Sequence, residues 1–329
     1  MNMPNKISVL KDLFDQYLAQ QKMTDNPENL YLPINYIMEL GGKRIRPVSA
    51  MIGYNVFKDD VGLALPLAYA LEIFHNFTLA HDDVMDVAEI RRGKPAMHIA
   101  YGLNSAILSG DAMLIYAYRY ITACKTSAEK KVQLINLFTD TAIEICEGQQ
   151  MDMDFEQLNE VALSSYLLMI KLKTAVLLAA SLKSGALLAG ASDKEGDHFY
   201  AFGLNIGLAF QIQDDVLDLY SEAVGFGKKL GGDILQKKKT YLYLKGLELA
   251  SAEKAGDLIE LYNSDNFPNE IKIEKVRAVF DELNVKDHAI GLMNELTENA
   301  YDHLNALEID NSKLTELRRL GEMLLARKS

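Results

Sequence analysis

The distribution of proline most constrains the fold of this chain. The seven prolines stand at positions 4, 27, 33, 47, 66, 95 and 268, so the stretch 96–267 contains none. Proline removes a backbone donor and clashes with the preceding helical turn, so long helices are expected where it is missing. In this stretch apolar residues recur three and four positions apart, as at Leu163, Leu167 and Ile170, and few runs alternate as strands do. The sequence predicts an all-α fold.

Short loop signals separate the predicted helices. Glycine-containing turns stand at 41–42, 92–95 and 231–233, and none is long or biased enough to be a linker between domains. The chain also shows no short-period repeat. We therefore expect one domain over residues 1–329, a bundle of ten or more helices around a central apolar cavity.

Composition limits the location and the partners. The chain carries 34 Lys and Arg against 46 Asp and Glu, a net charge of -12, which does not indicate the basic face of a nucleic-acid-binding protein. The two cysteines, Cys124 and Cys146, are isolated, which argues against a disulfide framework and a structural zinc site. We expect a cytoplasmic protein with no nucleic-acid partner.

The apolar segments predict neither a signal peptide nor a membrane span. Residues 1–18 mix lysines and aspartates among the apolar side chains, unlike a signal peptide. The most apolar later segment, 174–190, is interrupted by Lys183 and falls short of the roughly 20 apolar residues that cross a bilayer. We expect no transmembrane segment.

The strongest chemical signal is a cluster of aspartates at the end of an apolar helical run that begins near Leu67. The cluster consists of Asp82, Asp83 and Asp86. On a helix Asp82 and Asp86 lie one turn apart, with about 6 Å between their Cβ atoms. Their like charges repel unless a cation lies between them.

A second cluster repeats this spacing after the run 202–213, with Asp214, Asp215 and Asp218. A single cluster could equally be a solvated helix end, because short motifs give false positives. Two identical clusters on facing helices would instead form an all-oxygen site, which suits Mg²⁺ and its habit of bridging to substrate phosphates. The pair predicts a metal-bound diphosphate.

A diphosphate site also needs cationic side chains, and the arginine fork can grip phosphate oxygens bidentately. Each basic motif of this chain, taken singly, is typical of a solvated surface. In the first of them, a glycine turn precedes Lys43 and Arg46, and Pro47 can start the next helix. The motifs occupy 41–47, 91–95, 173–174, 227–228 and 237–240.

The order of these motifs resembles the trans-isoprenyl diphosphate synthases, also called polyprenyl synthetases. That family shows Gly-Gly-Lys-x-x-Arg-Pro, then Asp-Asp-x-x-Asp with Arg-Arg-Gly, then Lys-Thr, then Phe-Gln-x-x-Asp-Asp-x-x-Asp, then Gly-Lys and a later Lys. All are present in order between about 41 and 240, which makes the match highly specific. The resemblance implies an all-helical, Mg²⁺-dependent prenyltransferase that joins an allylic diphosphate to isopentenyl diphosphate head to tail.

The resemblance also implies roles for individual residues. The six aspartates would hold a cluster of about three Mg²⁺ ions, with Mn²⁺ as an alternative, against a dimethylallyl, geranyl or farnesyl diphosphate. The allylic diphosphate would be gripped by Arg91, Lys173, Lys228 and, with a weaker alignment, Lys238. Isopentenyl diphosphate would be bound by Lys43, Arg46, His75 and Arg92. Phe210, Gln211 and Thr174 would line the reacting centre, and the catalytic set would be Asp82, Asp83, Asp86, Lys173, Asp214, Asp215 and Gln211.

The chemistry that the family implies requires no nucleophilic side chain. Metals and cationic side chains stabilise the charge that develops as the allylic carbon–oxygen bond breaks. The dipoles of Thr174 and Gln211 would face the allylic cation, and apolar walls would exclude water. His75, without the resemblance, would be interpreted as a core histidine, and His81 is not included in the site.

In this family the product length depends on residues before the first aspartate cluster. Phe77 and Thr78, an aromatic followed by a small residue, match the pattern for geranylgeranyl diphosphate, whereas two aromatics accompany farnesyl diphosphate. On a helical wheel Thr78 lies about 40°, Phe74 about 80° and Phe77 about 140° from Asp82. Phe74 is therefore a second candidate for the chain-length floor, farnesyl diphosphate remains an alternative product, and a core role is open for both phenylalanines.

Two other functions remain as alternatives. A class I terpene cyclase carries a different metal motif on its second helix and binds no isopentenyl diphosphate, whereas this chain keeps the second aspartate cluster. A non-catalytic regulatory subunit usually loses one cluster, and both are intact here. The resemblance implies a homodimer. It also likens the basic tail, Arg318, Arg319, Arg327 and Lys328, to C-termini that close over the site, although a solvated tail fits as well.

Overall fold

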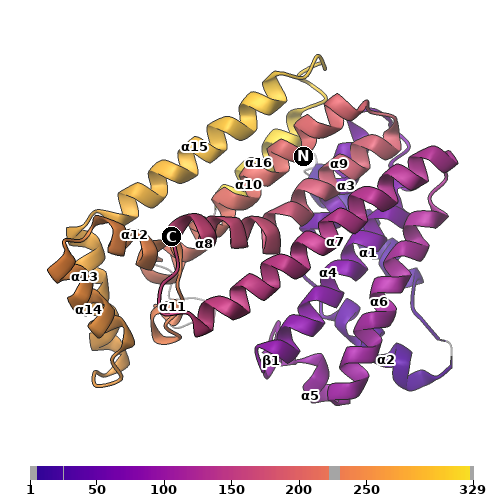
Figure 1. Ribbon diagram of the computed structural model, residues 1–329. Helices are drawn as coiled ribbons and strands as arrows, with labels where there is room; N and C mark the ends of the chain where they lie inside the picture. The colour runs from indigo at the N-terminus through magenta and orange to yellow at the C-terminus, as the bar shows by residue number, and fades with distance from the viewer. Residues whose placement is uncertain (1–5, 25, 222–229, 327–329) are drawn as a thin grey trace, which may run out of the picture. The chain divides into compact units, whose positions relative to one another are not determined.

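The computed structural model describes residues 6–24, 26–221 and 230–326. Its helices run from α1 to α16 in chain order (Figure 1). The sheet of the described residues is one short antiparallel pair, β1 (Ile90–Arg91) and β2 (Lys94–Pro95). The all-α prediction is confirmed.

The chain divides into two compact units, each assembled from segments that are distant in the sequence. The prediction of one domain over 1–329 stays a prediction beside this division. Unit 1 comprises Met1–Asp140, Ala180–Tyr200 and Ile309–Leu317, and unit 2 comprises Thr141–Ala179, Ala201–Glu308 and Arg318–Ser329.

Unit 1 is built around α4, which packs against α1, α3 and α6. The helix begins next to Pro66, which is well suited to a first turn, and its buried residues continue to Asp83. The predicted apolar run into the first aspartate cluster is therefore confirmed. The helices of unit 1 are α1 (Lys6–Gln20), α2 (Glu28–Glu39), α3 (Ile45–Asn55), the 3₁₀ turn η1 (Val61–Ala64), α4 (Leu65–Met85), α5 (Met97–Tyr101) and α6 (Leu103–Ala123).

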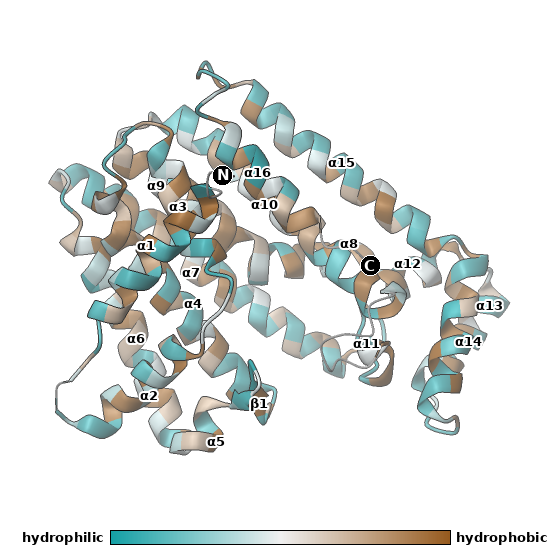
Figure 2. Cartoon of the chain, turned by 180° about the vertical axis from the view of Figure 1, so that it is seen from behind, coloured by the Kyte–Doolittle hydropathy of each residue, from teal (hydrophilic) through white to brown (hydrophobic). Residues whose placement is uncertain are grey.

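Unit 2 contains a core in which α12 packs against α8, α14 and α15. Its centre includes the fully buried Ile212, Leu258 and Val276. Helix α15 alternates between hydrophilic and hydrophobic residues along its length, as expected for a helix with one face on a core (Figure 2). The helices of this unit are α8 (Leu163–Ile170), the π-helical turn η2 (Lys171–Ala175), α11 (Gly232–Leu235), α12 (Tyr241–Leu249), α13 (Ala252–Asn263), α14 (Asn269–Glu282) and α15 (Val285–Asn305).

Four helices contribute residues to both units. They are α7 (Ala128–Gln157), α9 (Val176–Ala189), α10 (Asp193–Tyr220) and α16 (Thr315–Leu325). Helices α7 and α10 have 30 and 28 residues and lie in the proline-free stretch. The second aspartate cluster is in the last turns of α10, as the sequence predicts.

Two helical segments of the described chain are long and apolar enough to cross a membrane. They are Val61–Met85 and Leu163–Ala189, and 61% and 56% of their apolar windows are buried inside the protein. The sequence-based estimate of a short segment at 174–190 was wrong, because α8 and η2 extend it toward the N-terminus. Burial of more than half of each window is typical of core helices.

The close approach of α9 to α3 within unit 1 predicts a sharp difference between two glycine substitutions. A Cβ on Gly185 would overlap the carbonyl of Ala50, so Gly185→Ala should cost about 1–3 kcal/mol of unfolding free energy. Gly256, in α13, has no atom within 4 Å of such a Cβ, so Gly256→Ala should gain about 0.5–1 kcal/mol. Urea denaturation of the two variants measures both changes, and equal stabilities would contradict the close helix crossing.

Candidate active site

The first aspartate cluster ends α4 in a Schellman motif. The backbone N–H of Ala88 donates to the carbonyl of Asp83 at 2.9 Å, and Val87 takes the left-handed conformation with φ 52°. A β-branched residue in that region costs about 1–3 kcal/mol. Asp83 is buried, Asp82 is half-buried and Asp86 is exposed, so the three carboxylates run from the core to the surface.

Arg91 neutralises the buried carboxylate of this cluster. Its Nε lies 3.0 and 3.1 Å from the two carboxylate oxygens of Asp83, and its Nη2 also donates to Oδ1. The same Nη2 lies 3.7 Å from Oδ2 of Asp82. Burial alone would lower the pKa of Arg91, but Asp83 and Asp82 outweigh it and raise that pKa. Arg91 therefore stays charged and holds the first cluster in place.

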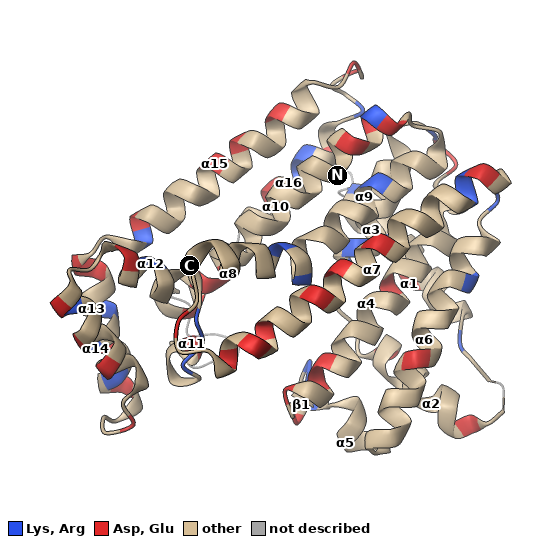
Figure 3. Cartoon of the chain, viewed as in Figure 1, with Lys and Arg blue, Asp and Glu red and all other residues tan. Residues whose placement is uncertain are grey.

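The predicted basic motif at 91–95 forms a hairpin. Arg91 pairs with Lys94, and the turn residues Arg92 and Gly93 have φ of 52° and 75°, as in a type I′ turn. Arg92 donates a hydrogen bond to the carbonyl of Gly41. The structure thus brings two predicted basic motifs together in unit 1. Positions of Lys or Arg (blue) and of Asp or Glu (red) lie close together along the ribbon at β1 (Figure 3).

Arg44 stabilises the fold by binding acidic and carbonyl groups inside unit 1. Its Nη1 lies 2.5 Å from Oε1 of the buried Glu72, its Nε lies 3.3 Å from Oδ1 of Asp15, and its Nη2 donates to the carbonyl of Met38 at 3.0 Å. The side chain is itself buried. The sequence assigned no role to Arg44, which stands at an unspecified position of the motif between Lys43 and Arg46.

Arg46 is the contrasting case, in the first turn of α3. Its Nε is buried, and no acceptor in the described part of the chain lies within hydrogen-bonding distance of it. Burial lowers the pKa of this guanidinium to about 10. An anion bound there would satisfy the donor and would also face the positive end of the helix. Helix α3 begins at Ile45, so the expectation that Pro47 starts it was wrong by two residues, and the exposed Lys43 precedes the helix.

His75 lies among the same basic side chains. Burial lowers its pKa well below the ordinary value, and Arg46, Arg92 and the neighbouring arginines lower it further. A neutral imidazole next to several guanidinium groups is the arrangement expected where an anion is to bind. The residues predicted for isopentenyl diphosphate, apart from the exposed Lys43, therefore form one electropositive cluster in unit 1.

The residues predicted to limit chain length lie one to two turns before the aspartates on α4. The rings of Phe74 and Phe77 are 5.6 Å apart, and Phe74 also meets Phe138 edge-on at 4.8 Å. Phe74 is buried, as the core interpretation expects. The hydroxyl of the half-buried Thr78 donates to the backbone of the preceding turn. His81 packs against α6, with its Nε2 3.2 Å from the carbonyl of Ile107, which gives it a structural contact.

The second cluster accepts hydrogen bonds from Tyr166, which precedes it in the chain, and from Asp233 and Tyr241, which follow it. Oδ2 of Asp215 accepts from the hydroxyl of Tyr166 at 2.6 Å and from the backbone N–H of Tyr241 at 3.0 Å. Oδ2 of Asp218 accepts from the backbone N–H of Asp233 at 3.0 Å. Burial raises the pKa of Asp215 to about 7, although the two hydrogen bonds oppose that rise. Nearby positive charge would restore the carboxylate to its ionised form.

Lys173 lies on the π-helical turn η2. Its Nζ lies 2.6 Å from Oδ2 of Asp152 on α7. A Cβ on Gly148 would overlap the backbone nitrogen of Lys173, so glycine permits this close approach. π-helical turns are frequent at functional sites, and this one displays Lys173 and the half-buried Thr174.

The remaining predicted residues are described by their position in the fold and their burial. Phe210 and Gln211 are half-buried on α10, in the turn before Asp214, while Lys238 is exposed. Lys228 lies outside the described residues.

Sequence reasoning missed Tyr166 and Tyr241 as partners of Asp215. A signal existed for Tyr166, because it stands seven residues, about two helical turns, before Lys173.

The donor set fits Mg²⁺ when a diphosphate completes the coordination. Among the residues that the structure describes, no three His, Cys, Asp or Glu side chains come close enough to hold a metal ion unaided. Mg²⁺ is commonly held by one or two carboxylates, several waters and substrate phosphates, and seldom by a cage of protein ligands alone. The carboxylates of each cluster are of the type that this requirement calls for, and those of the first lie beside the guanidinium of Arg91.

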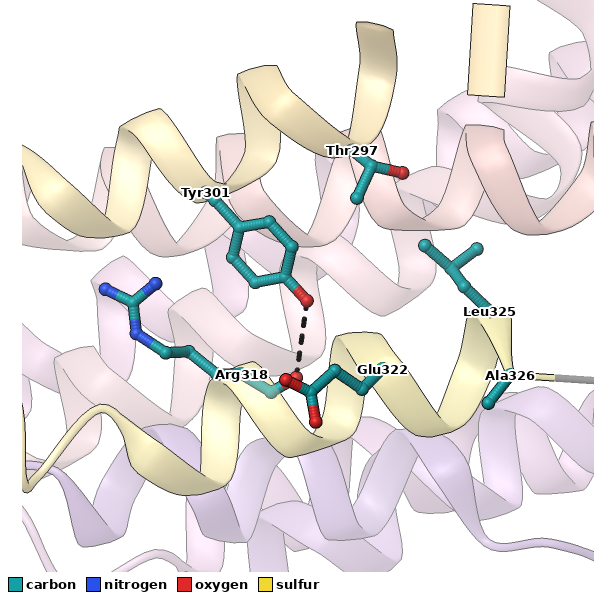
Figure 4. A pocket seen from close by; sticks show the side chains of 6 residues that line it. All are labelled: Thr297, Tyr301, Arg318, Glu322, Leu325 and Ala326. Carbon is teal, nitrogen blue, oxygen red and sulfur yellow. Dashed lines mark hydrogen bonds between the residues drawn. The ribbon is translucent and has the colours of Figure 1, made fainter. Parts of the chain in front are cut away.

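A hollow of about 580 Å³ lies beside α15 and α16 in unit 2 (Figure 4). The hydroxyl of Tyr301 donates to the carbonyl of Arg318 at 3.4 Å, and Arg318 donates to Oδ1 of Asn305 at 2.8 Å. No predicted catalytic or substrate-binding residue lines it. Arg318 is thus engaged locally, and Arg327 and Lys328 lie outside the described residues. The hollow is lined by Thr297, Tyr301, Arg318, Glu322, Leu325 and Ala326.

Comparisons with known proteins agree with this geometry. The family model described as "Polyprenyl synthetase" matches residues 27–281. The geranylfarnesyl diphosphate synthase of Natronomonas pharaonis is 32% identical over 337 residues, covering 98% of this chain and 96% of the relative. A crystal structure of a geranylgeranyl pyrophosphate synthase superposes with a TM-score of 0.92 at 39% identity over the whole of both chains. The Corynebacterium glutamicum geranylgeranyl pyrophosphate synthase, complexed with isoprenyl diphosphate and magnesium, gives 0.84 at 25% identity over both full chains.

Arg44 and Arg46 should behave differently on substitution. Arg44→Met leaves the buried Glu72 without its main partner and should cost about 3–5 kcal/mol of unfolding free energy. Arg46→Met removes a buried donor without a partner, so it should change that free energy by less than about 1 kcal/mol. Inorganic diphosphate should raise the melting temperature of the wild type and raise that of Arg46→Met less. The reverse order of stabilities would exclude these roles.

The lowered pKa of His75 predicts that the folded protein becomes less stable as the solution becomes more acidic. Because its pKa is lowered in the folded chain, the unfolded chain takes up a proton there below about pH 6.5 that the folded chain does not bind. The unfolding free energy should therefore fall as the pH falls below that value, by up to about 1.4 kcal/mol per pH unit from this group. Urea denaturation between pH 5 and 7 should give a shallower slope for His75→Gln. Identical slopes in both proteins would contradict a neutral His75.

Proposed function

Since this chain belongs to the polyprenyl synthetase family, we propose that it acts as a short-chain isoprenyl diphosphate synthase. Such a prenyltransferase joins an allylic diphosphate head to tail to isopentenyl diphosphate. The proposal rests on the two aspartate clusters. Each of two Asp-Asp-x-x-Asp clusters ends an apolar helical run, and each has one buried carboxylate held by fixed donors.

We assign the metal ions to the aspartates of both clusters. Mg²⁺ bound there would neutralise the allylic diphosphate and stabilise it as a leaving group. A count of about three ions, with Mn²⁺ as a substitute, is part of the proposal. The support is the all-carboxylate donor set and the magnesium complex of the Corynebacterium relative. The residues are Asp82, Asp83, Asp86, Asp214, Asp215 and Asp218.

Arg91 and Lys173 are proposed to grip the allylic diphosphate. Both already hold a carboxylate, Asp83 and Asp152 respectively. A guanidinium carries five N–H donors and an ammonium three, so each can keep its carboxylate and still donate to a phosphate oxygen. Lys228 and Lys238 are proposed for the same diphosphate.

The electropositive cluster in unit 1 is proposed as the isopentenyl diphosphate site. The buried Nε of Arg46, the guanidinium of Arg92 and the neutral His75 would donate to its phosphate oxygens, with Lys43 at the exposed side. Binding would give Arg46 the acceptor that its Nε requires.

The half-buried side chains before the second cluster are proposed to face the allylic cation. Phe210 offers the negative face of its ring, and the oxygens of Gln211 and Thr174 supply dipoles. These side chains would also keep water from the cation.

Geranylgeranyl diphosphate is our proposed main product. The support is the pair Phe77 and Thr78 and the likeness to geranylgeranyl pyrophosphate synthases. The Natronomonas relative is named for a longer product. Product length can therefore differ between relatives, and we propose that the residues at the floor of the site set it in this chain. Phe74 is packed between Phe77 and Phe138, and we include it in that floor. A cytoplasmic location is likewise proposed, from the two free cysteines.

Incubation of the purified chain with Mg²⁺, farnesyl diphosphate and isopentenyl diphosphate should yield geranylgeranyl diphosphate, identified by chromatography. Asp82→Asn and Asp214→Asn should lower turnover about a hundredfold or more, because each removes charge that holds the metals. The matched control is Asp257→Asn, an exposed aspartate on α13, which should retain wild-type turnover.

The same incubation separates the alternatives. A cyclised hydrocarbon would identify a terpene cyclase, and the absence of any reaction would fit a non-catalytic subunit. Near-normal turnover in both aspartate variants would exclude the metal assignment.

We propose a homodimer that uses the outer face of α6. Leu108 is 61% and Ile115 69% exposed, two turns apart on that helix, and Leu103 is exposed on the same helix. Contiguous apolar surface of this kind is typical of an interface. Together with Ile99 on α5, these side chains would be covered by the second copy.

Light scattering of the wild-type chain should give the mass of two copies. A Leu108→Glu, Ile115→Glu double variant should give that of one, because burying two charges opposes association. Ile259→Glu, which alters an exposed isoleucine on α13, is the matched control and should remain dimeric. A monomeric wild type would refute the dimer.

A further inference from the structure

Asp215 is anchored through a single carboxylate oxygen. Its Oδ2 accepts both from the hydroxyl of Tyr166, at 2.6 Å, and from the backbone N–H of Tyr241, at 3.0 Å. Asp215 is 8% exposed and Tyr166 4%. Two donors on one oxygen restrict the rotamer and the plane of the carboxylate, and neither of these two contacts uses the other oxygen, Oδ1.

Tyr166 is itself held firmly. It belongs to the core of unit 2, with Ile212, Val216 and Tyr241. Its helix, α8, packs against α12, the helix that begins at Tyr241. The hydroxyl of Tyr166 and the N–H of Tyr241 therefore come from two elements that pack against each other.

We propose that Tyr166 is a positioning residue for the metal site. Its hydroxyl holds Oδ2 of Asp215 so that Oδ1 is presented to the divalent cation of the second aspartate cluster. Partners that orient a metal ligand commonly change metal affinity about tenfold to a hundredfold when they are removed. The inference rests on the proposed function, because it takes Asp215 to be a metal ligand.

Unit 2 offers a matched control in Tyr220. This tyrosine lies on α10, is 6% exposed and belongs to the same core. Its hydroxyl donates to Oδ1 of Asp281 at 2.7 Å, so it makes the same type of bond to an aspartate outside both clusters. Tyr220→Phe therefore removes a comparable buried hydrogen bond without touching Asp215.

The test is Mn²⁺ binding to the full chain in the presence of inorganic diphosphate, followed by electron paramagnetic resonance. Tyr166→Phe should weaken Mn²⁺ binding about tenfold or more, whereas Tyr220→Phe should bind as the wild type does. In turnover assays, the Mg²⁺ concentration for half-maximal rate should rise by the same factor in Tyr166→Phe. Saturating Mg²⁺ should restore its kcat.

A double-mutant cycle shows whether Tyr166 acts through Asp215. In an Asp215→Asn background, Tyr166→Phe should weaken Mn²⁺ binding no further. Circular dichroism at the assay temperature establishes that each variant is folded. Thermal melts should show similar losses for Tyr166→Phe and Tyr220→Phe, since each loses one buried hydrogen bond.

Equal Mn²⁺ affinities of Tyr166→Phe and the wild type would overturn the inference and leave the proposed function standing. An equal weakening in Tyr166→Phe and Tyr220→Phe would also overturn it, since it would reflect general destabilisation. A wild-type chain that binds no Mn²⁺ with diphosphate would instead count against the proposed function itself.

Discussion

The structure depends on burying carboxylates only where a fixed donor meets them. Glu72 is held by Arg44, Asp83 by Arg91, and Asp215 by Tyr166. Removing an acid from water without such a partner costs several kcal/mol, so each pair is a condition for keeping acidic groups on apolar helices. The two clusters achieve this differently, because a charged arginine serves the first, whereas a hydroxyl and backbone amides serve the second. The buried carboxylate of the first cluster is thus paired with a charge, and that of the second with neutral donors.

Periodicity and proline placement were enough to predict the helices, including the run into Asp82 and the long α10. The aspartates could be selected because two identical acidic clusters on apolar helices are unusual, whereas Lys173 was selected by the order of the motifs. The motif selected Arg46 and left Arg44 without a role, since the partners of Arg44, Glu72 and Asp15, are distant in the sequence. These partners meet only when the chain folds, and no local pattern encodes that meeting.

The supporting residues of the site were harder still to predict. Tyr166 is an ordinary core tyrosine in composition, and Tyr241 contributes a backbone N–H that any residue other than proline would supply. The hairpin that carries Arg92 was expected only as a loop, because two paired residues leave no alternation to detect. The assignment of metal and substrate roles came from the order of the motifs.

The π-helical turn at 171–175 has a consequence for how this region can vary in length. A π turn closes its hydrogen bonds over five residues where an α turn uses four, so it amounts to one inserted residue. Each residue of a regular α-helix advances by about 100°, and the wider turn absorbs one such step. Deleting one residue of the turn is therefore expected to close it into regular α-helix and to leave α8 and α9 nearly in phase. The length of this segment can thus change by one residue without rotating Tyr166 away from its core, whereas Lys173, which lies inside the turn, depends on the turn for its orientation.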